Sequence, residues 1–186
     1  HNSLTLLIVP MDTAGIEVRP IRQIDGSDEF CEVFFNDVRV AADGGVGAVD
    51  HGWSGAVSVL EVERATNRMY RGWRFENEVR HLLAACGSVP ALAAASAAGE
   101  SAALLARAAA DARITQLYAE EIVGKILADR SPGATGSLMK LHWSEAHQRF
   151  ADLALRLLSG PVAEPGAALV RARRRFERIY LRARSE

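Results

Sequence analysis

The chain has 186 residues, of which 49% are apolar and 24% are charged, and its formal net charge is −1. This composition is typical of a globular domain with a hydrophobic core, and it gives no overall attraction for nucleic acid or for an anionic membrane. No apolar run is long enough to cross a membrane, and no basic segment leads into an apolar one at the start of the sequence, so we expect a cytoplasmic protein with no membrane span.

The cysteines and histidines predict no metal site. Cys31 and Cys86 are far apart and form neither a CxxC nor a Cys/His spacing, which favours reduced thiols. The five histidines include no HExxH motif. His142 and His147 would lie about 140° apart on a helix, too far around it to share a metal.

Residues 1–51 have the pattern of β-structure. An apolar run at residues 4–9 ends at Pro10, and because it has no lead-in we expect a longer polypeptide before it. Residues 16–21 alternate apolar and polar side chains. Residues 30–40, FCEVFFNDVRV, predict a hairpin that turns at Asn36-Asp37.

After Gly52 the pattern is helical. We predict a first helix over residues 54–85, ended by Gly87 and Pro90, and then a loop-like alanine-rich stretch before Gly99. Further helices are predicted over residues 100–130, 137–160 and 169–185. Their apolar stripes need neighbouring helices to cover them, and an antiparallel bundle satisfies this requirement.

Seven arginines lie between residues 171 and 184, where they could bind the phosphates of nucleic acid or of a nucleotide cofactor. Leu169, Phe176 and Ile179 recur at helical spacing in the same segment, so one face is apolar. We therefore interpret the arginines as a solvated helix face and predict no nucleic-acid partner.

Glu63 is the candidate catalytic residue. On a helix with about 100° per residue, Glu63 falls on the same face as Trp53, Val59 and Leu60. A carboxylate that loses water either finds a partner or becomes harder to ionise, and both outcomes suit a general base. Charged side chains on helices are more often solvated, however, so a structural ion pair involving Glu63 remains the alternative.

Four motifs occur in order along the chain. Residues 7–16, LIVPMDTAGI, are similar to a strand and turn of the form "LV-x-D-T-x-G-V", and residues 29–40, EFCEVFFNDVRV, to "EF-x-EVFF-D-DVRVP". Gly52-Trp53 followed by Glu63-Arg64 is similar to "GW…ER", and residues 136–141, GSLMKL, to "aS-x-x-K". By these motifs the chain resembles the acyl-CoA dehydrogenase family over most of its length.

The resemblance implies a fold as well. Family members have a helical N-terminal domain, a β-domain and a C-terminal helical bundle. We therefore expect a mainly α protein with an N-terminal β portion, in which residues 1–51 are the second half of the middle β-domain and residues 52–186 are the C-terminal helical bundle. The expected fold class is an incomplete β-domain followed by an antiparallel four-helix-type bundle.

The resemblance also implies an activity, because family members are FAD-dependent enzymes that oxidise the Cα–Cβ bond of an acyl-CoA thioester. A carboxylate removes the α proton while the β hydrogen leaves as hydride to the flavin. In several branches the base is the glutamate before arginine in the "GW…ER" helix, which corresponds to Glu63. Glu61 and Arg64 correspond to residues near the bound substrate, although Glu61 replaces an aspartate. The implied partners are an acyl-CoA substrate, an electron-transferring flavoprotein or similar acceptor, and further subunits, alike or different, packed through the bundle.

The sequence also departs from the family pattern. It contains neither the flavin-binding "T-E-x-G-x-GSD" and "W-x-T" signatures nor the "GGTS" or "EGTS" motif near which other branches place the base. Alanine-rich residues 90–99 replace "R-x-x-FG", and only Arg113 resembles an arginine of other branches, so the cofactor-binding residues are unassigned. The alternative is a catalytically silent or heteromer-forming subunit that acts as a scaffold without its own flavin site; a flavin monooxygenase of the same fold is a third possibility.

Overall fold

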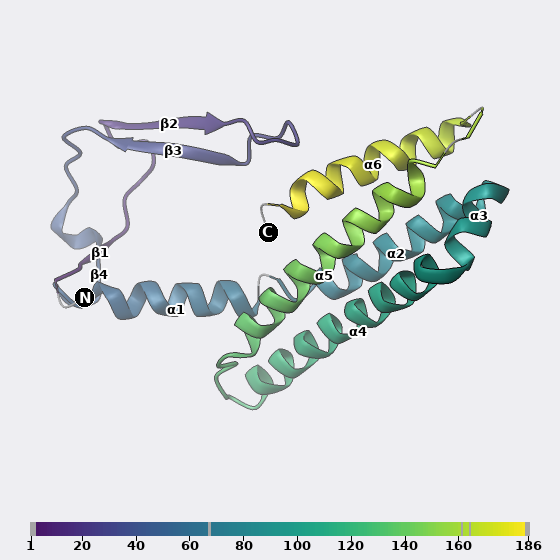
Figure 1. Ribbon diagram of the computed structural model, residues 1–186. Helices are drawn as coiled ribbons and strands as arrows, with labels where there is room; N and C mark the ends of the chain where they lie inside the picture. Colours follow the sequence, from purple (N-terminus) through teal and green to yellow (C-terminus); the bar gives the residue numbers. More distant parts are fainter. Residues whose placement is uncertain (1–2, 67, 161, 164, 185–186) are drawn as a thin grey trace. The chain divides into compact units, whose positions relative to one another are not determined.

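The computed structural model describes residues 3–66, 68–160, 162–163 and 165–184, with only the backbone described at residues 64 and 65. The chain divides into two compact units, His1–Val62 and Glu63–Glu186, and each is described by itself. Short strands precede a series of helices along the chain (Figure 1). The predicted fold class, mainly helical with a short N-terminal β portion, is confirmed.

The strands of the first unit form two small antiparallel pairs. Strand β1 (Leu6–Leu7) pairs with β4 (Gly45–Val46), which follows a short 3-10 helix, η1 (Ala42–Gly44). Strand β2 (Ile16–Ile21) pairs with β3 (Phe30–Phe35), so that Ile16 lies opposite Phe35 and Ile21 opposite Phe30. The turn between β2 and β3 is closed by the Gln23 N–H, which donates to the Ser27 carbonyl at 2.7 Å.

The predicted hairpin within residues 30–40 is wrong, because the partner of β3 is β2. Asp37 has a φ of 50°, and no strand follows it before β4. The Asn36 N–H instead donates to the Gly15 carbonyl at 2.9 Å. Gly15 has a φ of 93°, and a Cβ there would lie 2.2 Å from the Asn36 oxygen, so this close approach requires glycine.

The predicted first helix is in fact two helices, α1 (Gly52–Ala65) and α2 (Arg71–Gly87). Between them the Met69 N–H donates to the Thr66 carbonyl at 3.4 Å, in a turn. The sequence Thr66-Asn67 has low helix propensity, and the break lets the start of α2 approach α4 (Gly99–Leu127). A periodic pattern alone did not reveal this break.

The alanine-rich stretch before Gly99 is also helical, as α3 (Pro90–Ala97), and the predicted loop there is wrong. Pro90 occupies the first turn, where its missing N–H costs nothing. The bounds of the remaining helices, α4, α5 (Thr135–Leu158) and α6 (Ala167–Ala183), lie within a few residues of those predicted.

The hydrophobic core of the second unit lies between α2, α4, α5 and α6. Phe150 of α5 is at its centre, with ring centroids 5.2 Å from Phe75 of α2 and 6.1 Å from Phe176 of α6. All three rings are almost fully buried. Among the helices of the described chain, none is long and apolar enough to cross a membrane.

Candidate functional site

Glu63 lies in the last turn of α1, where the chain leaves the helix. The turn after α1 brings Arg68 back to it, and Arg68 Nη2 donates to Glu63 Oε1 at 3.1 Å. The Glu63 side chain is 44% exposed and that of Arg68 is 26% exposed. Glu63 is therefore an accessible carboxylate with an arginine on one of its oxygens.

The apolar side chains that share the Glu63 face of α1 are exposed. Trp53 is 43%, Val59 63% and Leu60 43% exposed, so the prediction that this face is buried is wrong for the chain as described. Periodicity identifies an apolar face of a helix but does not supply the element that covers it. Glu63 consequently keeps much of its hydration.

The two candidate substrate-binding residues differ in what the structure describes. Glu61 lies on α1 two positions before Glu63, and its side chain is exposed. The side chain of Arg64 lies outside the described part of the structure. Of the three residues singled out on this helix, a side-chain contact is described for Glu63, and its partner is Arg68.

A second acidic group, Glu78 of α2, is buried and was not predicted as a site. His147 Nε2 lies 2.7 Å from Glu78 Oε2, and Arg74 Nε donates to Glu78 Oε1 at 2.9 Å. Burial by itself raises the pKa of Glu78, but the hydrogen bond and charge of His147, followed by those of Arg74, outweigh it and hold the pKa below its usual value. Both carboxylate oxygens are occupied, which indicates a structural role.

Aromatic rings enclose the histidine of this pair. The His147 ring stacks on Trp143 with centroids 5.0 Å apart and meets Phe75 edge-on at 5.5 Å. Glu78 lies beside Val79 and three positions after Phe75, on the apolar face of α2. The face argument applied to Glu63 would therefore have identified Glu78, whereas its partner, 69 positions away, could not be paired from spacing.

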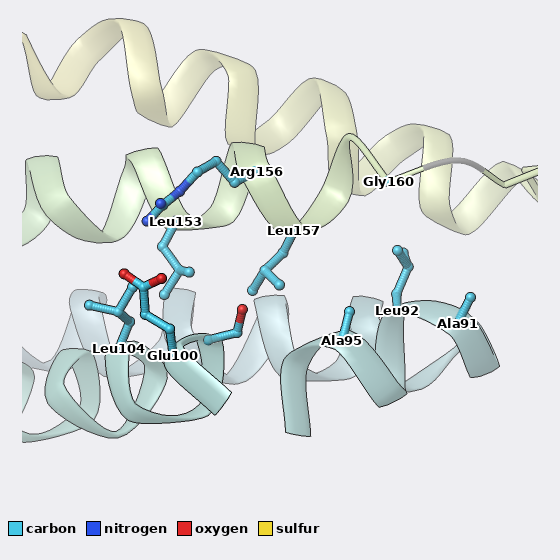
Figure 2. Close-up of a pocket in the computed structure, with 10 residues that line it drawn as sticks. Ala91, Leu92, Ala95, Glu100, Leu104, Leu153, Arg156, Leu157 and Gly160 are labelled. Carbon is cyan, nitrogen blue, oxygen red and sulfur yellow. The ribbon is translucent and has the colours of Figure 1, made fainter. Parts of the chain in front are cut away.

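A cavity of about 350 Å³ lies between α3, α4 and α5 (Figure 2). Its walls are mainly leucine and alanine side chains, because the short alanines of α3 do not fill the space opposite Leu153 and Leu157 of α5. The charged ends of Glu100 and Arg156 lie at the same end of the cavity in Figure 2. Glu63, in the same unit, does not line it, so the cavity is separate from the candidate catalytic residue.

Neither Arg113 nor the cavity in Figure 2 suits the diphosphate of a flavin dinucleotide. A site for this cofactor needs cationic or N–H donors at the diphosphate together with a slot for the flavin ring. Arg113 is already held by Glu120 Oε1 at 2.7 Å and by Gln116 Oε1 at 3.1 Å. The cavity in Figure 2 contributes an apolar wall and a charged pair of opposite signs, which does not suit a diphosphate.

No group of three or more histidine, cysteine, aspartate or glutamate side chains that could hold a metal ion is found among the described residues. The two cysteines are free thiols, with Cys31 exposed and Cys86 buried. Burial raises the pKa of the Cys86 thiol, which opposes formation of a reactive thiolate there.

The chain thus has a β portion followed by a helical bundle, with a charged pair where α1 ends. Residues 50–186 match the model of the acyl-CoA dehydrogenase C-terminal domain. The chain thus belongs to the acyl-CoA dehydrogenase family.

Relatives of known sequence support this assignment. The chain is 32% identical over 164 residues to acyl-CoA dehydrogenase IpdE1 of Mycobacterium tuberculosis, a match that covers 87% of this chain and 40% of the relative. It is 34% identical over 161 residues to acyl-CoA dehydrogenase FadE34 of the same organism, which covers 86% of this chain and 21% of the relative. The chain therefore spans less than half the length of these relatives.

Solved structures share the fold. The Tcur3481-Tcur3483 steroid ACAD superimposes with a TM-score of 0.71 at 20% identity, covering 97% of this chain and 46% of that one. The prolyl acyl carrier protein oxidase AnaB superimposes with a TM-score of 0.77 at 16% identity, covering 99% and 48%. At these identities the similarity establishes the fold alone.

Proposed function

We propose that the chain is the C-terminal part of an acyl-CoA dehydrogenase that oxidises the Cα–Cβ bond of an acyl-CoA thioester. Membership of the family and the order of the sequence motifs support this proposal. In the proposed organisation, residues 1–51 complete the β-domain and residues 52–186 form the helical bundle domain. The family model begins at residue 50, close to this boundary.

Glu63 is the proposed base, because one oxygen of its carboxylate is available to accept a proton. Arg68 bonds Oε1, while Oε2 has no hydrogen bond to any residue in the described part of the chain. An accessible carboxylate with one oxygen bonded to an arginine can accept the α proton of a thioester on its other oxygen. We place Glu61 and Arg64 near the substrate because their positions in the helix match the family pattern.

Members of the family are typically FAD-dependent, and the flavin takes the β hydrogen in such dehydrogenations. In this proposal Glu63 contributes the proton acceptor, and the cofactor is a flavin whose binding residues are unassigned. An electron-transferring flavoprotein or similar acceptor would then reoxidise it.

The test is a Glu63→Gln variant of the full-length protein, which keeps the shape of the side chain and removes the base. We expect its flavin content to stay the same and the rate of flavin bleaching by acyl-CoA to fall at least about 100-fold. Glu145→Gln is the matched control, since Glu145 is also an accessible carboxylate beside an arginine, with Arg149 Nη1 at 3.9 Å. Equal bleaching rates in the Glu63 variant and the wild type would remove Glu63 from the mechanism.

A second candidate is a subunit without its own flavin that serves as a scaffold in a heteromer. The replacement of the "R-x-x-FG" motif by alanine-rich residues 90–99 favours it, and solved structures of the same fold include a ChsE4-ChsE5 complex from Mycobacterium tuberculosis. Exposed apolar side chains on α4 and α5, namely Ile114, Leu117, Leu138 and Leu141, offer a surface for assembly through the bundle. A colourless full-length protein, without absorbance near about 450 nm, would favour the scaffold; a yellow one would favour the enzyme.

A further inference from the structure

A second hollow of the helical unit lies between α2 and α6, and we call it the α2–α6 groove. Four alanines and Phe176 form its apolar floor, and His81, Arg171 and Arg175 form its basic rim. Its volume is about 310 Å³. No aspartate or glutamate of the described chain lines it.

The groove exists because small side chains face each other on the two helices. Ala84 and Ala85 near the end of α2 lie opposite Ala168 and Ala172, one turn apart on α6. Methyl groups at these positions leave space that leucines would fill. Phe176 is fully buried and closes the floor, so the hollow is apolar where it is deepest.

Two arginines of the rim are not used to hold the fold together. Arg173, by contrast, donates to the Leu158 carbonyl at 2.7 Å and to the Gly160 carbonyl at 2.9 Å, and thereby ties α6 to the end of α5. Arg171 and Arg175 have no ion pair and no hydrogen-bond acceptor on their side chains anywhere in the described chain. They are four positions apart, so both guanidinium groups lie along the same side of α6.

The remaining polar groups of the groove do not compete for these arginines. Ser88 donates its hydroxyl to the Ala85 carbonyl at 2.7 Å and its N–H to the Ala84 carbonyl at 3.2 Å, so the exposed carbonyls at the end of α2 are already hydrogen-bonded. His81 Nδ1 lies 2.6 Å from the Asn77 carbonyl, which leaves Nε2 for a ligand. The rim therefore presents net positive charge above an apolar floor.

The geometry points to a binding site for a small amphipathic carboxylate, with its anionic head held by Arg171 and Arg175 and its apolar chain on the alanine and phenylalanine floor. Guanidinium groups bind carboxylates through paired hydrogen bonds, and these strengthen beside apolar surface because water is excluded. A volume of about 310 Å³ is at the lower end for ligand pockets, so the apolar chain is short. Glu63, which belongs to the same unit, does not line the groove, so this inference does not rest on the proposed catalytic function.

Octanoate is a suitable probe, titrated by calorimetry into the full-length protein below its micelle concentration. We expect saturable binding with one site per chain. Acetate, which lacks the apolar chain, and 1-octanol, which lacks the charge, should bind at least about tenfold more weakly. No binding of octanoate, or equal binding of 1-octanol, would overturn the proposal.

Matched variants locate the site. Arg171→Gln combined with Arg175→Gln should weaken octanoate binding at least about tenfold, whereas Arg178→Gln, on the same helix but outside the groove, should leave it unchanged. Ala168→Leu should also weaken binding, because it fills the groove from an exposed position without altering charge. Helical circular dichroism checks that each variant is folded. Unchanged affinity for octanoate in the double variant would contradict the assignment. Binding of an acidic peptide, but not of octanoate, at Arg171 and Arg175 would also contradict it.

Discussion

Phenylalanine side chains are buried in one unit of this chain and exposed in the other. In Glu63–Glu186, Phe75, Phe150 and Phe176 are at most 1% exposed, whereas in His1–Val62, Phe30 is 56% and Phe35 61% exposed. Helices that carry one apolar stripe can cover each other, but a ribbon of two strands has two faces and no layer to place on either. The helical unit thus contains its own core, while the strands depend on covering that the unit itself does not provide.

Truncation of an aromatic side chain is expected to give the largest difference in stability between the two units. Phe150→Ala should lower the free energy of unfolding by about 3–5 kcal/mol, since it removes the ring that joins Phe75 and Phe176. Phe35→Ala, the same change at an exposed strand position, should cost less than about 1 kcal/mol. Urea unfolding followed by helical circular dichroism measures both, and equal losses would break the comparison.

The buried pair of Glu78 and His147 is expected to come next. Glu78→Gln should lower the free energy of unfolding by about 3 kcal/mol at neutral pH. The substitution removes the carboxylate that bonds the buried His147 and the partly exposed Arg74. The folded-state pKa of Glu78 is below its ordinary value of 4.5, so its contribution is fully present above that pH and is lost as the pH falls through the folded-state pKa.

The measurement is urea unfolding of wild type and Glu78→Gln at a series of pH values from about 7 down to about 3. The difference in stability between the two proteins should shrink as the pH falls below 4.5. A difference that stayed constant over this range would show that the charge of Glu78 makes no contribution to folding.

A smaller effect tests how closely α2 and α4 pack. Gly72→Ala places a Cβ 2.6 Å from the Gln116 backbone nitrogen, so the helices must separate, at a cost of about 1–3 kcal/mol. Gly124→Ala, in α4 with nothing within 4 Å of the added carbon, should instead stabilise by about 0.5–1 kcal/mol. Thermal unfolding of the two variants should therefore shift in opposite directions.

The smallest effect is expected from an ion pair of the helical unit whose side chains are exposed, as the strands of the first unit are. Arg184 Nη2 lies 2.5 Å from Asp152 Oδ1, but the side chains are 40% and 47% exposed. Asp152→Asn should change the free energy of unfolding by less than about 0.5 kcal/mol, because water screens the pair. A loss comparable to that of Glu78→Gln would show that exposure is a poor guide to the strength of ion pairs in this bundle.

Much of the helical unit could be predicted from the sequence, because glycine, proline and apolar periodicity act locally. The break at residues 131–133 and the stop after Leu158 are examples. The turn after Thr66 could not be predicted, because the residues there are only weak helix formers. The packing of α2 on α4 determines where the helix breaks. Pro90 predicts the end of a helix, whereas in the structure it begins α3, because proline is also tolerated in the first turn of a helix.

Prediction of the site was more limited, since it depends on groups that are distant in sequence. Glu63 could be singled out from its face and motif, but its contact with Arg68 depends on a turn that no pattern indicated. The pairing of Glu78 with His147 requires two helices to be brought together, and spacing within one helix contains no information about that.

Gly52 stands where strand β1 and helix α1 come closest in the first unit. Its N–H donates to the Leu4 carbonyl at 2.7 Å, and a Cβ there would lie 2.3 Å from the Leu6 nitrogen. Side chains also contribute to this junction, because the Thr5 hydroxyl accepts a hydrogen bond from the Asp50 N–H at 3.0 Å. A single methyl group added at Gly52 would force the two main-chain segments apart.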